Sequence, residues 1–587
     1  MRILLISSAF NSMAQRFYVE LVDAGYDVAL ELHVGNDSRL FEAVSIFEPD
    51  LIIAPFLTKA IPVEIWGKRI CIIVHPGIEG DRGPSSLDWA IQERRETWGV
   101  TLLQAAAEMD AGPIWASRTF PMRSAPKSSI YRLEVIEAAV ECLWEVIEKF
   151  GQAGFRPRPL DYANPAVIGK ERPLMKQADR RIDWNDHTTT EILARIHAAD
   201  GVPGVLDEIR GVSVLLHNAC AESKLTGRPG EMLAAASNGA ICRATVDGAV
   251  WLGHLKPKLG NHAGIKLPAT QVIGDMLPSD IRRIEPEANI FSDEPSIQEI
   301  RCEIIENIGL LHFDFHNGAM STPQCQQLLR AYKRLAEEPV KTIVLMGGRE
   351  HWSNGIHLNH IEAHDDPAEE SWSNINAMDD LVHEIILTKD KLVIAALACG
   401  AGAGGAILPL AADFILCRDG VVLNPHYKNM GCLYGSEYWT YLLPKRVGWE
   451  RATELTENCL PLSANRAKQL GLIDEVLSRD PETFRQEALE FAKGKRNLLF
   501  YVLAKKRLRL QKDQEHKPLA AYRQHELTQM YKNFYIPNSP YHLARQSFVR
   551  KQPACWSPLS ARMLKSVGLD LPTQLASHSE RLYLESA

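Results

Sequence analysis

A histidine placed to carry a proton stands at the end of an apolar run early in the chain. Residues 72–76 read IIVHP, which predicts a buried strand that ends at His75. Ligands of open α/β sheets bind beyond the carboxyl ends of the strands, so this position favours chemistry. An imidazole titrates near neutral pH and can accept or donate a proton. The alternative for His75 alone is a packed or capping histidine.

Glycine-rich turns mark a second region where chemistry is expected. Residues 352–358 read WSNGIHL, and residues 402–406 read GAGGA after the apolar segment LVIAA at 392–396. Glycine in such turns lets a backbone N–H approach a ligand closely. Two such N–H groups can bind the oxygen of a thioester as an oxyanion hole. The alternative is that the glycines allow tight packing of helix against strand.

Several short segments follow His75 in a fixed order. They read RGP at 82–84, WAI at 89–91, GVT at 99–101, MDAGP at 109–113 and IDW at 182–184. Together they resemble the folate-dependent formyltransferases, such as the methionyl-tRNA formyltransferases, over about residues 1–280. The resemblance implies formyl-tetrahydrofolate as one-carbon donor. It implies that His75 carries a proton, that Asp110 orients it, and that Arg82 and Gly83 belong to the substrate-binding segment.

One position departs from the formyltransferase pattern. The family has asparagine two residues before the histidine, where this chain has Ile73. Isoleucine cannot donate a hydrogen bond, and loss of one oxyanion donor can cost about 100- to 1000-fold in rate. Transfer to an amine is therefore not expected. Ser12, Gln15 and Arg16 are candidate replacement donors, and the alternative is that they only begin the first helix.

The second region resembles the crotonase, or enoyl-CoA hydratase/isomerase, superfamily. Besides the two turns, LSA at 462–464 and GLIDEV at 471–476 match its later helix and exit strand, so the resemblance covers about residues 300–480. It implies a site for a coenzyme A thioester. The backbone N–H groups of Ile356 and Gly404 take the places of its oxyanion hole.

The acid and base groups of the hydratases are missing here. One glutamate position holds Ile407, and the other falls in NPHY at 424–427, so hydration of an enoyl thioester is not expected. The polar groups nearby are His426, Tyr427 and Glu437. Tyrosine and glutamate together could relay a proton. The alternative is a buried tyrosine whose hydroxyl is hydrogen-bonded.

The order of the two halves resembles a family of nickel–iron hydrogenase maturation factors. This resemblance implies a relay in which formyl-tetrahydrofolate gives its formyl group to coenzyme A, and formyl-CoA then breaks into carbon monoxide and coenzyme A. It implies the hydrogenase maturation machinery as partner and no metal cofactor. Two alternatives remain: a formyl-tetrahydrofolate hydrolase joined to an independent acyl-CoA hydrolase or decarboxylase, and a non-catalytic scaffold that binds folate and coenzyme A.

Alternating strand and helix signals must position these residues. In the first part, strands are predicted at 3–7, 26–32, 51–54 and 71–74, and helices at 14–24, 40–47 and 131–150. This alternation predicts a parallel sheet covered on both faces. Short strands between glycine and proline turns, at 212–216 and 249–252, predict a small β-rich unit, and a second α/β pattern has strands at 308–313, 342–346 and 393–397.

The chain of 587 residues is too long for one core, and four domains are predicted. They are a Rossmann-like formyltransferase domain (1–160), a formyltransferase C-terminal-like, β-barrel-like domain (161–285), a crotonase-type ββα spiral domain (286–490) and a helical extension (491–587).

Composition narrows the functional classes. A net charge of −8 gives no support to nucleic-acid binding, and the basic residues at 505–512 form either a solvated helix face or an anion site.

Eleven scattered cysteines without a CxxC pair indicate reduced thiols in a cytoplasmic protein. The uncharged segment Leu392–Ala412 is rich in glycine and alanine, so we interpret it as buried structure and expect no membrane span.

Overall fold

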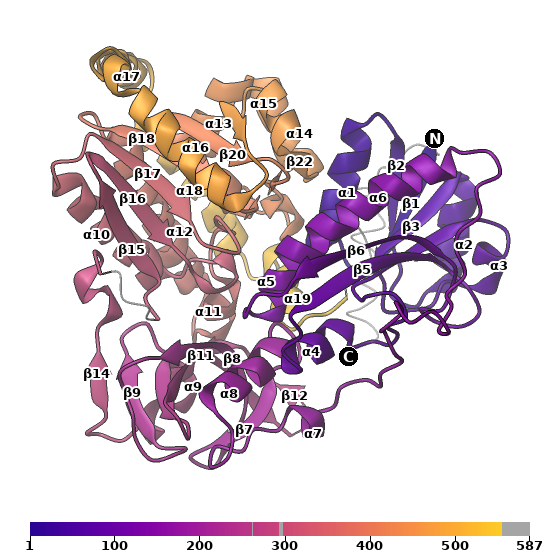
Figure 1. Ribbon diagram of the computed structural model, residues 1–587. Coiled ribbons are helices and arrows are strands. Elements are labelled where there is room, and N and C mark those ends of the chain that lie inside the picture. The colour runs from indigo at the N-terminus through magenta and orange to yellow at the C-terminus, as the bar shows by residue number, and fades with distance from the viewer. Residues whose placement is uncertain (261, 293–296, 554–587) are drawn as a thin grey trace.

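The computed structural model describes residues 1–260, 262–292 and 297–553, which form three successive parts (Figure 1). The first part is built on a six-stranded sheet with the order β2-β1-β3-β4-β5-β6. Its strands are β1 (Arg2–Ser7), β2 (Asp27–Leu32), β3 (Leu51–Phe56), β4 (Cys71–His75), β5 (Thr97–Gln104) and β6 (Ile114–Pro121). Strands β1 to β4 are parallel, as predicted. Strand β5 pairs antiparallel with β4 and with β6. No helix separates β5 from β6, so these two form a hairpin.

Both faces of this first sheet are covered by helices. Ile3 and Leu5 of β1 enter one core, and Leu4 and Ile6 enter the core on the opposite face. The strand is therefore apolar throughout instead of alternating, as expected for a parallel strand buried on both sides. The covering helices are α1 (Ser12–Asp23) and α6 (Ile136–Phe150) on the first face and α2 (Asp37–Phe47) on the second.

The second part is the predicted β-rich unit. Its longest strands, β8 (Val212–Glu222) and β11 (Ala249–Leu259), pair antiparallel and contain both predicted segments. The main path of the sheet runs β14-β9-β10-β11-β8-β7. Helix α8 (Thr189–Ala198) packs on it through Ile192 and Ile196. The other strands of this path are β7 (Val205–Ile209), β9 (Met232–Ala236), β10 (Ile241–Ala244) and β14 (Arg282–Ile284), and the short β12 (His262–Ala263) and β13 (Leu267–Pro268) pair with β11.

The third part has the crotonase-type arrangement. A six-stranded sheet runs β15-β16-β17-β18-β20-β23, and a small sheet runs β19-β21-β22. Helices α10 and α12 cover one face of the large sheet and α16 covers the other. The strands of the large sheet are β15 (Ile300–Ile305), β16 (Ile308–Phe313), β17 (Thr342–Gly347), β18 (Leu392–Leu397), β20 (Phe414–Arg418) and β23 (Glu475–Leu477), and those of the small one are β19 (Ala401–Gly402), β21 (Val422–Asn424) and β22 (Leu462–Ser463). The helices are α10 (Thr322–Glu337), α12 (Pro367–Leu387) and α16 (Pro481–Gly494).

The described part of the chain ends in helices, as predicted. They are α17 (Leu499–His516), α18 (Leu519–Tyr535) and α19 (Pro540–Val549). The predicted extension also includes residues 554–587, which lie outside the described residues. The segment Leu392–Ala412 forms buried β18 and short 3-10 turns. Within the described part of the chain, no helix combines the length and apolar character that a membrane crossing needs.

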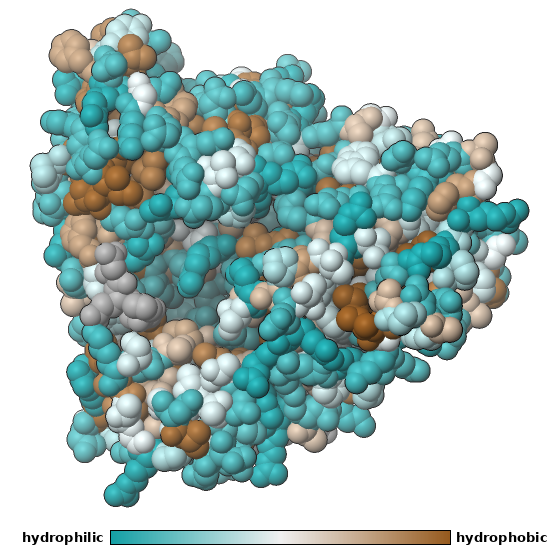
Figure 2. Space-filling model, viewed as in Figure 1, coloured by the Kyte–Doolittle hydropathy of each residue, from teal (hydrophilic) through white to brown (hydrophobic). Residues whose placement is uncertain are grey.

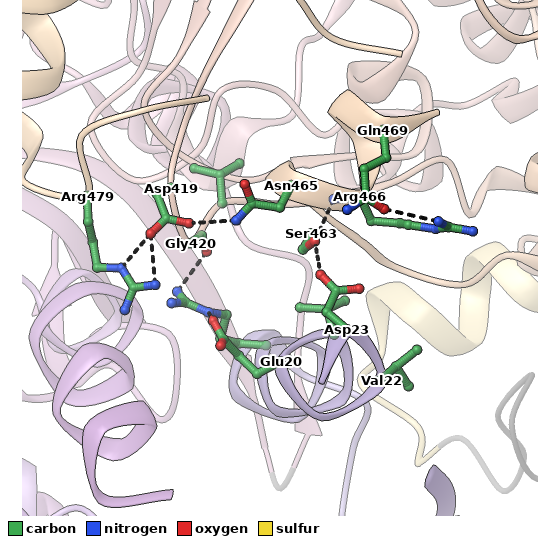
Figure 3. Close-up of a pocket in the computed structure, with 13 residues that line it drawn as sticks. Glu20, Val22, Asp23, Asp419, Gly420, Ser463, Asn465, Arg466, Gln469 and Arg479 are labelled. Carbon is green, nitrogen blue, oxygen red and sulfur yellow. Dashed lines mark hydrogen bonds and ion pairs between the residues drawn. The ribbon is translucent and has the colours of Figure 1, made fainter. Parts of the chain in front are cut away.

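Helix α1 joins the first part to the third. The guanidinium of Arg16 pairs with Glu20 and Glu137 and donates to the carbonyl of Gly420, 2.7 Å away. Ser463 donates to Asp23 across the same boundary. Figure 3 shows the small pocket between α1 and α15 (Ala464–Gln469), about 510 Å³, around which these groups meet. The contact of α1 with the third part is therefore made largely of hydrogen bonds, and the ion pairs of Arg16 stay within the first part.

Candidate functional site

His75 lies between two carboxylates. The last residue of β4 brings its ring to the carboxyl edge of the sheet, where only 5% of the side chain is exposed. Its Nε2 is 3.0 Å from Oδ2 of Asp81, and its Nδ1 is 3.7 Å from Oδ2 of Asp110. The first distance is a hydrogen bond and the second exceeds one. The structure thus brings together the two residues predicted as a pair, and adds a carboxylate that the sequence analysis missed.

Asp81 is held in place by the linker that follows the first part. Backbone hydrogen bonds join Arg82 to Lys170 and to Arg172, so the linker covers the loop after β4 and buries the Asp81 side chain. Nε of Arg172 lies 3.7 Å from the other oxygen of Asp81. A side chain on Gly77 would collide with Nε2 of His75 and lie 2.6 Å from Asp81, so only glycine leaves room for this contact. The burial of Asp81 under the linker has no local signal in the sequence, because Arg172 is 91 positions beyond Asp81.

The predicted substrate-binding residues surround the same end of β4. The amide of Gly83 donates to Oδ2 of Asp110 at 3.3 Å, and Arg82 pairs with Glu108 at 2.6 Å. Ser12, Ile73 and Gly83 line a large cavity together with His75 and Asp110.

Two of the candidate replacement donors face elsewhere. Gln15 accepts from Nδ2 of Asn424 at 3.2 Å, and Arg16 is committed to its ion pairs with Glu20 and Glu137 and to the Gly420 carbonyl. Among the three candidates, only Ser12 lies on the wall of the cavity.

The two glycine-rich turns meet in the third part. A Cβ placed on Gly355 would lie 3.2 Å from the amide nitrogen of Gly404, which puts the turn that carries Ile356 directly against the second turn. Ile356 and Ala403 line the cavity from these turns. His426, whose Nδ1 is 2.8 Å from the carbonyl of Asn424, lines it beside them, and burial lowers its pKa.

Glu437 and Tyr427 lie behind the turns. A Cβ on Gly404 would collide with Oε1 of Glu437, and one on Gly435 would lie 2.5 Å from the Tyr427 ring. Burial raises the pKa of Glu437 to about 8, with the charge of Asp379 adding to it. The pKa of Tyr427 is raised well above its usual value by burial and then by Glu437. The Tyr427 hydroxyl has no hydrogen-bond partner of normal geometry among the described residues, although Thr456 lies near enough to act on its pKa.

A buried acidic cluster holds the loop that carries Glu437. Asp379 of α12 accepts from the amide of Glu437 at 2.8 Å and from the hydroxyl of Ser436 at 2.9 Å. Glu526 of α18 accepts from the amides of Tyr438 and Thr440 at 3.0 and 2.7 Å. Burial raises the pKa of Asp379 to about 7 and that of Glu526 to about 8. These bonds fix two consecutive left-handed residues, Glu437 and Tyr438, whose φ angles are 59° and 60°.

One cavity of about 1490 Å³ reaches both candidate sites. Its wall includes His75 and Asp110 from the first part and Ile356, Ala403 and His426 from the third. Figure 2 shows the molecule hollowed near the centre of one face, where the three parts adjoin. The geometry therefore allows a bound molecule to extend from one site toward the other.

Cations and neutral histidines line part of the wall of this cavity. Nζ of Lys266 is 2.7 Å from Nε2 of His316, whose ring lies 4.4 Å from that of His254. Burial lowers the pKa of Lys266 to about 8, and it lowers the pKa of both histidines well below the usual value. The cations on the wall are Lys59, Lys127, Arg132, Lys256, Lys266 and Lys551. This set of residues could not be predicted from the sequence, because its members come from all three parts and from the C-terminal helical region.

Over residues 1–260, 262–292 and 297–553, no three His, Cys, Asp or Glu side chains are grouped so as to hold a metal ion. The cavity wall instead offers groups suited to an elongated anionic ligand: cations, imidazoles and apolar side chains.

The sequence matches two family models. Residues 305–558 match the enoyl-CoA hydratase/isomerase family, and residues 174–269 match the formyl transferase C-terminal domain. The hydrogenase maturation factor HoxX of Bradyrhizobium diazoefficiens is 44% identical over 566 residues, which cover 95% of this chain and 96% of that protein. The methionyl-tRNA formyltransferase of Roseiflexus castenholzii is 29% identical over 178 residues, 30% of this chain and 55% of that enzyme.

A solved structure is similar over nearly the whole length. The crystal structure of HypX from Aquifex aeolicus in complex with tetrahydrofolic acid superposes with a TM-score of 0.90 at 44% identity, covering 96% of this chain and 98% of that one. The joined architecture, and not only each half, is therefore shared.

Proposed function

This chain belongs to the family of the hydrogenase maturation factors HoxX and HypX, and from that premise we propose that it makes carbon monoxide for the active-site iron of a nickel–iron hydrogenase. The formyl group of formyl-tetrahydrofolate passes to coenzyme A at His75. Formyl-CoA then loses carbon monoxide at the crotonase-type site.

The first step is proposed at the edge of the first sheet. Tetrahydrofolic acid is bound by the Aquifex relative, and here formyl-tetrahydrofolate is proposed to lie beside His75 and Asp110 in the cavity. The thiol of coenzyme A attacks the formyl carbon, and the bond to the folate nitrogen breaks. A thiol ionises much more readily than an amine loses a proton, so this acceptor suits a site with Ile73 in place of an asparagine.

The second step is proposed at the facing glycine turns. The N–H groups of Ile356 and Gly404 bind the thioester oxygen, while Glu437 and Tyr427 move the formyl proton toward the departing sulfur. Carbon monoxide and coenzyme A are the products. Since the C–H and C–S bonds break and one S–H bond forms, no oxidant, reductant or water is consumed.

The single observation that carries this proposal is the continuous cavity between the two sites. A pantetheine arm can present its thiol first to one site and then to the other without leaving the protein. Arg132, Lys256, Lys266 and Lys551 line the cavity, and they are the groups proposed to bind the phosphates of coenzyme A.

Product analysis tests the proposal. The purified protein is incubated with formyl-labelled formyl-tetrahydrofolate and coenzyme A, and the headspace gas is trapped with deoxyhaemoglobin. Labelled carbon monoxide that requires coenzyme A is the expected product. Labelled formate without carbon monoxide would contradict the proposal and indicate a formyl-folate hydrolase.

A further inference from the structure

Asp81 gives His75 an environment that differs between its two ring nitrogens. Nε2 contacts Asp81, whose side chain is fully buried, whereas Nδ1 faces Asp110 on the cavity wall across 3.7 Å. In a neutral imidazole one nitrogen donates and the other accepts. Because the Asp81 carboxylate can only accept, the neutral ring carries its hydrogen on Nε2, which leaves the lone pair of Nδ1 on the side of Asp110 and the cavity wall.

We propose that Asp81 is a positioning residue that fixes this tautomer of His75, so that Nδ1 is the base that takes the proton from the acceptor thiol. The inference rests on the proposed formyl transfer to coenzyme A. The thiol proton moves to Nδ1, the thiolate attacks the formyl carbon, and the carbon–nitrogen bond of the folate breaks. The proton then passes from Nδ1 to the folate nitrogen, which regenerates the neutral ring.

The surroundings of Asp81 suit this role. The imidazolium formed during transfer lies between two carboxylates, Asp81 and Asp110, which stabilise its charge. The guanidinium of Arg172 lies 3.7 Å from the second oxygen of Asp81, an ion pair without a hydrogen bond, and Glu93 in turn pairs with Arg172 at 3.0 Å. Gly77 leaves the space that the contact between His75 and Asp81 needs. The arrangement parallels the buried aspartate that orients the histidine of a serine protease.

The Asp81→Asn variant tests the proposal, because it changes the tautomer with little change in shape. Arg172 attracts the amide oxygen, so the amide nitrogen faces Nε2 and moves the ring hydrogen to Nδ1. The rate of formyl transfer at pH 7 should fall about 100- to 10,000-fold, the usual contribution of a general base. The loss should shrink as pH rises past about 8.5, where a thiol ionises without help. Tetrahydrofolate affinity should not change.

The matched control is Glu79→Gln, which alters a carboxylate of the same loop that pairs with Arg158 and does not touch His75. The double variant Asp81→Asn with Arg172→Met frees the amide to turn its oxygen toward Nε2, and should recover about tenfold of the lost rate. A purely structural role for Asp81 predicts no such recovery.

The tautomer can also be read in the unmodified protein, should Asp81→Asn not fold. Nitrogen-15 spectra of histidine-labelled protein, with the signal assigned by its loss in His75→Gln, should show hydrogen on Nε2 in the neutral ring. Hydrogen on Nδ1 overturns the inference. The inference is also overturned if the Asp81→Asn variant transfers the formyl group at the normal rate, or if its transfer rate is reduced by the same factor at every pH. If the unmodified protein transfers no formyl group to coenzyme A, the proposed function itself fails.

Discussion

The hydroxyl of Tyr427 and the carboxyl of Glu437 are buried polar groups, and burying them lowers the stability of the folded protein. Their proposed role in proton transfer explains why the protein keeps them. Tyr427→Phe removes a buried hydroxyl that lacks a normal hydrogen-bond partner, so the free energy of unfolding should stay equal or rise by about 1 kcal/mol. Carbon monoxide release from formyl-CoA should nevertheless fall. Thermal unfolding and headspace analysis measure the two effects, with the exposed Tyr501→Phe as control. Undiminished gas release would remove Tyr427 from the relay.

Glu437 makes stability depend on pH in a defined direction. In the unfolded chain the carboxyl ionises near pH 4.5, while in the folded protein its pKa is about 8. Between these values the folded state holds a proton that the unfolded state has lost, so stability falls as pH rises from about 4.5 to about 8. Glu437→Gln should therefore stabilise the protein at pH 8 by about 1–2 kcal/mol and lose gas release. Denaturant unfolding of the variant and the unmodified protein at pH 5 and pH 8 measures this stabilisation. An equal change in the free energy of unfolding at both pH values would contradict the prediction.

The segment from Gly435 to Thr440, which runs into the first turn of α13 (Trp439–Val447), is the element that positions Glu437, and α18 holds it. Glu526→Ala would leave the amides of Tyr438 and Thr440 unpaired, so the free energy of unfolding should fall by about 2–4 kcal/mol. Decarbonylation of formyl-CoA should fall with it, while formyl transfer at His75 should persist. Glu490→Ala on α16, an exposed carboxylate paired with Lys493, is the control. Equal loss of both half-reactions would show general unfolding instead.

The elements themselves were largely predictable, and the contacts between them were not. The apolar run at 72–76 predicted β4 with His75 at its end, and glycine patterns placed the two turns that meet at Gly355 and Gly404. The antiparallel β5 was not predicted, because strand direction depends on the connection and not on the strand's own residues.

Contacts distant in sequence explain what the sequence analysis missed at the site. Asp81 acquires its place only when the linker at Arg172 folds over it, and Lys266 meets His316 only when the second and third parts pack together. The polar residues Gln15 and Arg16 carry no local sign that α1 faces the third part.

For the whole molecule, the packing of the halves keeps one cavity continuous. Arg16→Met would leave Glu20 and Glu137 without their buried partner, and should lower the free energy of unfolding by about 3 kcal/mol. The variant also removes the hydrogen bond from Arg16 to the Gly420 carbonyl of the third part, so the spacing of the two sites is less fixed. A smaller share of the consumed formyl group should then appear as carbon monoxide. The ratio of gas to formate measures this, with the exposed Arg330→Met as control. A destabilised protein with an unchanged ratio would mean that the interface does not maintain the relay.

Carbon monoxide released from two alternative donors tests most directly whether two sites act in sequence on one formyl group. The unmodified protein, His75→Ala and Glu437→Gln are each supplied with either formyl-tetrahydrofolate plus coenzyme A or formyl-CoA. The unmodified protein should release gas from both donors, His75→Ala only from formyl-CoA, and Glu437→Gln from neither while formyl-CoA accumulates from the folate donor. Gas release by His75→Ala from formyl-tetrahydrofolate, or formate as the sole product of the unmodified protein, would contradict the sequence of two sites.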